Sequence, residues 1–86
     1  MKVLIPSPLR SYTGGRSEVE GAGATVVEVL DDLDRRHPGL KFRMVDEQGQ
    51  VREHMRVFVN GESCRSLEDL VGPTDEVFIV QALSGG

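Results

Sequence analysis

The spacing of apolar residues in the first half of the chain predicts one main helix. Thr25 and Glu28 form a capping-box pair, in which each side chain can bond a free backbone N–H at the helix start. The apolar stripe repeats every three or four residues and consists of Val26, Val29, Leu30 and Leu33. Pro38-Gly39 ends the helix after about a dozen residues. The side chains expected to face water are Asp31, Asp32, Asp34 and Arg35.

Short β-branched and apolar runs on both sides of this helix predict strands. The expected strands cover residues 2–5, 16–20, 55–60, 62–65 and 76–81. Asn60-Gly61 is the strongest hairpin signal in the chain, and a loop from Pro6 to Gly15 joins the first two strands. Ser66 is expected to cap a brief helical turn that ends at Leu70.

The order strand, strand, helix, strand, short strand, strand predicts an α+β fold of the β-grasp type. In this fold a mixed sheet of four to five strands carries one main helix across one face. We expect the folded domain to cover residues 1–81, followed by a flexible tail at 82–86 with nothing to hold it. The expected core consists of Val3, Ile5, Val26, Leu30, Leu33, Met55, Val57, Val59, Leu70, Val77 and Ile79.

Strand alternation leaves Phe58, Phe78 and Val80 on the sheet face that the helix does not cover. Apolar side chains gathered on an exposed face can mark a surface that docks a partner. The alternative is that the loop from Phe42 to Gln50 folds over them. We expect a docking surface.

Composition allows one small domain and excludes several classes of function. The chain has 86 residues, of which 14 are acidic and 10 basic, and the net charge of −4 is the wrong sign for nucleic acid. Residues 1–43 carry a net +1 and residues 44–86 a net −5, which predicts partners with basic surfaces near the tail. No apolar stretch is long enough for a signal peptide or a membrane helix, so we expect a cytoplasmic protein.

No residue cluster predicts catalysis or a metal site. Cys64 is the only cysteine, which excludes an internal disulfide, and His37 and His54 have no partner ligands nearby in the sequence. The segment Gly21-Ala22-Gly23-Ala24-Thr25-Val26 imitates a dinucleotide fingerprint, but Val26 replaces the third glycine. A tight turn before the helix explains this segment better. We expect no enzyme activity in the chain itself.

In two motifs the chain resembles the ubiquitin-like sulfur-carrier proteins of the MoaD, ThiS and CysO type. The last strand runs into Ala82-Leu83-Ser84-Gly85-Gly86, and terminal Gly-Gly is common to all three branches. Residues 6–15 are similar to the Pro-x-x-Leu-Arg-x-x-Thr-Gly-Gly segment of the CysO branch. The resemblance covers the whole chain and favours the CysO branch.

The resemblance implies chemistry at the carboxylate of Gly86. An ATP-consuming enzyme of the ubiquitin-activating type would adenylate Gly86, and sulfur would then replace AMP to give a thiocarboxylate. Gly85, Ser84 and Leu83 would thread through a narrow channel in the partner enzyme, which glycine suits because it lacks Cβ. The chain itself would bind no cofactor.

The resemblance leaves several partners and pathways open. A sulfhydrylase or a synthase subunit would accept the sulfur, and a metalloprotease could trim the C-terminus. Cysteine is the favoured product, with molybdopterin, thiamine or a specialised metabolite as alternatives. The chain could instead be a modifier that is joined through Gly86 to target lysines, or an interaction module without tail chemistry.

Overall fold

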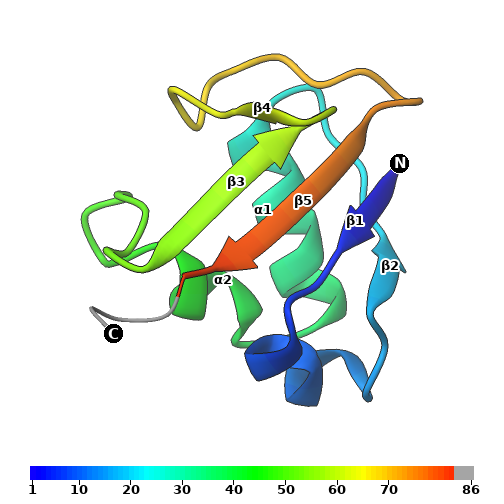
Figure 1. Ribbon diagram of the computed structural model, residues 1–86, viewed down its shortest axis with the longest axis vertical. Helices are drawn as coiled ribbons and strands as arrows, with labels where there is room; N and C mark the ends of the chain where they lie inside the picture. The colour runs from blue at the N-terminus through cyan, green and yellow to red at the C-terminus, as the bar shows by residue number, and fades with distance from the viewer. Residues whose placement is uncertain (83–86) are drawn as a thin grey trace.

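The computed structural model describes residues 1–82 and shows a five-stranded mixed sheet (Figure 1). Its strands are β1 (Lys2–Leu4), β2 (Glu18–Glu20), β3 (Met55–Val59), β4 (Glu62–Ser63) and β5 (Glu76–Gln81). They lie in the order β2-β1-β5-β3-β4, with β5 parallel to β1 and antiparallel to β3. This arrangement confirms the β-grasp fold, and the bounds expected for the last strand match β5.

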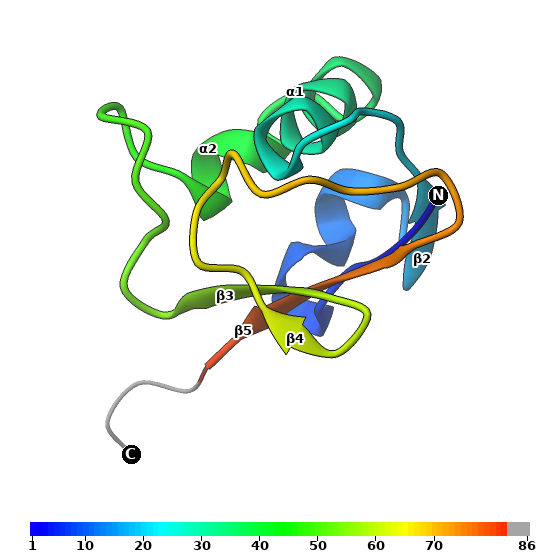
Figure 2. The ribbon, with the colours of Figure 1, turned by 90° about the horizontal axis from the view of Figure 1, so that it is seen from above.

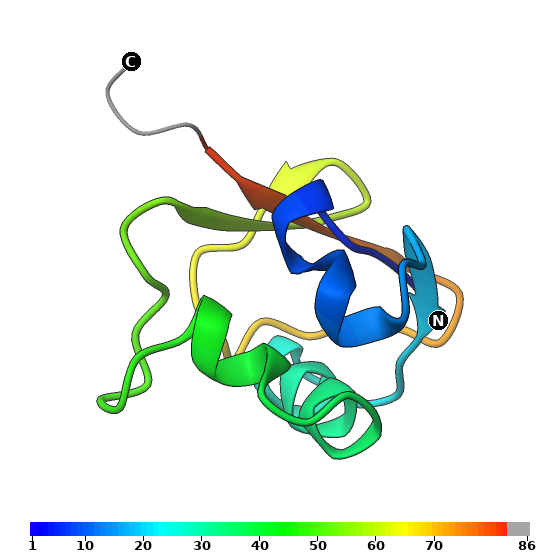
Figure 3. The same ribbon diagram turned by 90° about the horizontal axis from the view of Figure 1, so that it is seen from below.

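The helices are α1 (Val26–Arg36), α2 (Leu40–Met44) and a 3-10 helix, η1 (Ser7–Thr13). Both α-helices lie on one side of the sheet (Figure 2), and η1 lies close to α2 (Figure 3). The sequence predicts α1 but neither of the other two helices. Both short helices contribute residues to the core: Leu9 in η1 and Leu40 and Met44 in α2 are almost fully buried. Their formation therefore depends on packing against the rest of the fold.

The start of α1 is fixed by its own cap and by a distant segment. The Glu28 N–H donates to Thr25 Oγ1 at 3.3 Å, as the capping box predicts, although Glu28 Oε1 accepts from the Ala24 N–H instead of that of Thr25. Two free N–H groups of the first turn, those of residues 26 and 27, donate to the carbonyls of residues 69 and 67. A Cβ on Gly23 would lie only 2.7 Å from the backbone nitrogen of Val29, so this position requires glycine.

The expected core is confirmed except for two residues. Val59 is partly buried and packs against the core, but Leu70 is 81 % exposed. The segment after Ser66 forms the expected single turn, which the Asp69 N–H closes by donating to the Ser66 carbonyl, and Ser66 Oγ caps it by accepting from the Glu68 N–H. Leu70 then pairs with Thr25 in an isolated antiparallel bridge. In extended backbone neighbouring side chains point to opposite sides, so Val71 is buried in place of Leu70.

The turn at Asn60-Gly61 and the strands around it largely agree with the prediction. Asn60 and Gly61 have φ angles of 52° and 86°, as the predicted two-residue turn requires. The Asn60 side chain donates to Asp75 and accepts from the Glu76 N–H, which ties the turn to β5. The second strand begins at Glu18 and the fourth ends at Ser63, so both are shorter than expected.

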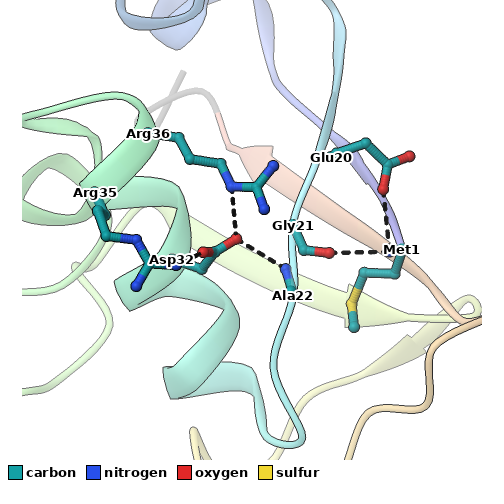
Figure 4. Close-up of polar contacts among 7 residues, drawn as sticks. All are labelled: Met1, Glu20, Gly21, Ala22, Asp32, Arg35 and Arg36. Atoms are coloured by element: carbon teal, nitrogen blue, oxygen red, sulfur yellow. Dashed lines mark hydrogen bonds and ion pairs between the residues drawn. The ribbon is translucent and has the colours of Figure 1, made fainter.

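Asp32 is buried, contrary to the expectation that it faces water, with only 4 % of its side chain exposed. Its Oδ2 accepts from the Ala22 N–H at 3.0 Å and pairs with Arg36 Nε at 3.0 Å, while Oδ1 pairs with Arg35 (Figure 4). Burial raises the pKa of Asp32, but the Ala22 hydrogen bond and the two arginine charges together lower it below its ordinary value. Asp32 thus joins α1 to the segment that leads into it.

Candidate functional site

The candidate site is the end of the sheet at which β5 finishes. Gln81, the last residue of β5, lies opposite Met55, the first residue of β3. One residue further, the Ala82 N–H donates to the His54 carbonyl at 2.7 Å, so the backbone is held through Ala82. The sequence predicted no such contact for Ala82. The expected tail residues Leu83, Ser84, Gly85 and Gly86 lie outside the described residues.

An apolar patch occupies the open face of the sheet beside this point. Phe58 and Phe78 are direct cross-strand partners and both are half-buried, while Val80 is 40 % exposed. Leu4 extends the patch because it lies next to Phe78 in the parallel pairing of β1 and β5. Alternation along one strand predicts which residues share a face, but only the strand order brings Leu4 into the patch.

The segment 42–50 does not cover this patch. It lies at the edge of the sheet on the side of α2 (Figure 2), where Val45 and Val51 form an isolated bridge. Charged residues flank the patch along the strands. Lys2 Nζ lies 3.8 Å from Glu18 Oε2 and 3.5 Å from Glu76 Oε2. Arg56 is the cross-strand neighbour of Val80 near the end of β5.

Residues 6–15, the second motif of the resemblance, build η1 and its exit. Leu9 is 1 % exposed and fills the core. The buried Thr13 hydroxyl lies 2.8 Å from the Arg16 carbonyl and 3.2 Å from that of Arg10. Gly14 then adopts a left-handed conformation with φ 66°, which ends the helix. The described contacts of this motif therefore maintain the fold.

Cys64 lacks the surroundings of a reactive thiol. Its Sγ donates to the Ser66 carbonyl at 2.8 Å, and its side chain packs partly against the core. Burial raises the pKa of the Cys64 thiol and the nearby Asp69 carboxylate raises it further, which keeps the sulfur protonated at neutral pH.

Both histidines lie outside any group of side chains within residues 1–82 that could bind a metal. His37 caps the end of α1, and His54 uses its backbone carbonyl to hold Ala82. Within residues 1–82, no three His, Cys, Asp or Glu side chains form a group that could hold a metal ion. None of the helices within the same range is long and apolar enough to cross a membrane.

Comparison with known proteins agrees with the resemblance. Residues 3–86 match the ThiS family. The sulfur carrier protein CysO of Mycobacterium tuberculosis is 33 % identical over 98 % of this chain and 96 % of its own length. Small archaeal modifier protein 1 of Haloferax volcanii is 35 % identical over 83 % of this chain and 79 % of its own length.

Solved structures give the same result for the fold. A chain of the Amycolatopsis orientalis BexX/CysO complex is 41 % identical, with a TM-score of 0.91 over 99 % of this chain and 98 % of its own. Mycobacterium tuberculosis CysO is 30 % identical, with a TM-score of 0.90 over 95 % of this chain and 98 % of its own. The match of residues 3–86 to the family, together with the nearly full-length similarity to CysO, shows that the protein belongs to the ThiS family of sulfur-carrier proteins.

Proposed function

We propose that this protein carries sulfur as a thiocarboxylate on Gly86 and delivers it to a biosynthetic enzyme. The observation that supports this best is the match of residues 3–86 to the ThiS family, which includes the terminal Gly85-Gly86. The described structure adds a central strand that ends beside the tail and an apolar patch on the same sheet.

Activation is needed because the Gly86 carboxylate is a poor electrophile. An ATP-dependent enzyme of the ubiquitin-activating type would join the carboxylate to AMP and release pyrophosphate. Sulfide would then displace AMP and leave a thiocarboxylate directly, whereas a protein persulfide would displace AMP to give an acyl disulfide. A second thiol of the sulfur donor would cleave that acyl disulfide, which forms a disulfide in the donor and releases the thiocarboxylate, whose sulfur is a nucleophile. ATP is consumed by that enzyme, and the carrier holds no cofactor.

Sulfur delivery requires a tail long enough to reach the active site of the enzyme and a surface that binds the enzyme. Five extended residues from Ala82 span about 17 Å, which is enough to pass from a docked domain into a buried site. Phe58, Phe78 and Val80 would form the docking surface for the activating enzyme and for the sulfur acceptor. A cytoplasmic location, and release or trimming of the C-terminus by a metalloprotease, belong to the same proposal.

The two named relatives favour different second steps. The similarity to CysO supports a small-molecule acceptor, with cysteine as the favoured product and a sulfhydrylase as the acceptor. A synthase subunit would serve instead if the product is molybdopterin, thiamine or a specialised metabolite. The similarity to small archaeal modifier protein 1 supports a second candidate function, conjugation through Gly86 to target lysines.

Mass spectrometry of the protein isolated from its native host separates the two functions. A thiocarboxylate increases the mass by the difference between sulfur and oxygen, whereas conjugation gives much heavier isopeptide adducts. In vitro, the adenylating enzyme of the same organism should form an acyl-adenylate with the wild type, little with Gly86→Ala, and none after deletion of Gly86. Normal adenylation of the shortened chain would overturn the proposal.

A further inference from the structure

Two grooves lie on either side of the segment that precedes β3. The first has a volume of about 390 Å³ and lies between residues 49–53, β3 and residues 63–67. The second has a volume of about 290 Å³ and is lined by Phe42, Arg43, Gln81 and the segment 52–55. Arg52, Glu53 and Met55 line both grooves, so the grooves form one continuous surface.

This surface gathers positive charge on an acidic protein. Four of the ten basic residues line the grooves, against one of the fourteen acidic residues, Glu53. The four are Arg43, Arg52, Arg56 and Arg65. Within residues 1–82 none of these arginines forms an ion pair, whereas Lys2, Arg35, Arg36 and Lys41 all do. Their charge therefore remains available to a partner.

Two of the arginines are held in place by the backbone. Arg52 Nε donates to the Phe42 carbonyl at 2.7 Å, and its guanidinium lies 4.6 Å from the centre of the Phe42 ring. Arg56 Nη1 donates to the carbonyls of Glu53 and Met55, both at 2.8 Å. Fixed side chains lose less conformational entropy when they bind, which favours recognition of a partner over simple solvation.

The basic surface reaches the point at which the tail begins through its second groove. Gln81 lines the second groove, Arg56 lies opposite Val80, and His54 holds Ala82. An enzyme that holds residues 83–86 in its active site must therefore approach these arginines. The net charges of the two half-chains predict a basic partner, but the arrangement of the arginines in space favours the opposite sign.

We infer that Arg43, Arg52, Arg56 and Arg65 form a docking surface for an acidic segment of the enzyme that activates the tail. This inference rests on the proposed function, because only tail chemistry brings that enzyme to this end of the sheet. Carboxylates in the grooves would pair with the guanidinium groups and orient the carrier so that its tail enters the active site.

The test measures binding of the full chain to the adenylating enzyme of the same organism. Arg43→Glu and Arg65→Glu are suitable variants because neither side chain has a hydrogen bond within residues 1–82, so folding should be preserved. Arg16→Glu makes the same charge change in an exposed residue of the loop between η1 and β2 and serves as the matched control.

We expect each groove variant to raise the Kd about three- to tenfold at low salt, mainly through slower association, and Arg16→Glu to change it less than about twofold. Raising the salt from about 50 to about 300 mM should weaken wild-type binding more than binding of the groove variants. Equal effects of all three variants, or tighter binding by the groove variants, would overturn the inference.

Two further results separate this inference from the proposed function. If the wild type is adenylated but the groove variants bind like the control, the inference fails and the proposed function stands. If the wild type binds that enzyme through the arginines but is never adenylated, the docking surface stands, whereas the proposed function and the role of the bound enzyme as activator of the tail both fail. Inorganic phosphate that shifts the NMR signals of the grooves, with enzyme binding unchanged in the variants, would assign the grooves to a small anion and also overturn the inference.

Discussion

The backbone N–H of Ala82 donates a hydrogen bond to the carbonyl of His54 at 2.7 Å, one residue beyond the end of β5. This bond extends the pairing of β3 and β5 past the last strand residue. It holds Ala82 beside the second basic groove, which Gln81 and His54 help to line.

Replacement of Ala82 by proline should loosen this contact without unfolding the domain. Proline lacks the N–H, and the extended backbone of Gln81 tolerates a following proline. We expect the free energy of unfolding to fall by about 1 kcal/mol and the KM of the adenylating enzyme for the carrier to rise several-fold. Ala82→Ser keeps the donor and is the control; identical KM values for the two variants would contradict the prediction.

Phe78→Ser should mainly weaken enzyme binding and Ile79→Ser should mainly reduce stability, although the two residues are adjacent in β5. Phe78 is half-buried on the open face, so its loss should cost about 1 kcal/mol and lower the Tm by about 4–8 °C while it weakens enzyme binding. Ile79 is 3 % exposed on the core face, and its replacement by a polar residue should cost about 3 kcal/mol or more. Thermal unfolding measures the loss of stability, and calorimetry measures the change in enzyme binding. A loss of stability for Phe78→Ser as large as that for Ile79→Ser would show that Phe78 belongs to the core.

The contribution of Asp32 to stability should depend on pH. Because its pKa is lowered in the folded state, the charged carboxylate stabilises the fold fully above the ordinary pKa of about 4. That contribution is lost as the pH falls through the lower folded-state pKa. Urea unfolding should show Asp32→Asn to be less stable than the wild type by about 1–3 kcal/mol at pH 7, with a smaller difference near pH 2. The exposed Glu47→Gln is the control, and a difference independent of pH would contradict this role.

Leu9→Ala should reduce stability and leave the chemistry of the tail intact. The side chain is 1 % exposed, so its truncation leaves a cavity that costs about 2–5 kcal/mol. The exposed Ser11→Ala in the same helix should be nearly neutral. Below the Tm of the variant, the kcat of adenylation should equal that of the wild type. A lower kcat with normal stability would instead give the 6–15 motif a direct role with the enzyme.

Local signals in the sequence predicted the parts of the fold that depend on neighbouring residues. Thr25 and Glu28 marked the start of α1, Asn60-Gly61 marked the hairpin, and alternation placed Phe58 and Phe78 on one face of the sheet. Each of these features is decided within a few residues by backbone geometry and hydrogen bonding.

The features that the sequence does not predict depend on contacts between distant segments. Val71 is buried and Leu70 is exposed because the pairing of Leu70 with Thr25 fixes which side chain faces the core. Asp32 is buried because the segment that contains Ala22 packs against α1 at this point. The basic grooves combine arginines from α2, the segment before β3, β3 itself and the segment after β4. A net charge summed along the chain therefore does not reveal them. A spacing pattern does not contain this information.

The central position of β5 links the presence of the tail to the completion of folding. During synthesis β5 is the last of the described strands to emerge, yet it lies between β1 and β3 and supplies core residues Val77 and Ile79. A chain that stops before β5 lacks the middle of its sheet and leaves β1 and β3 with unpaired edges. Every protein molecule that carries the tail therefore also contains the strand that completes the domain, so an enzyme that acted on the tail would always meet it on a chain that can complete its fold.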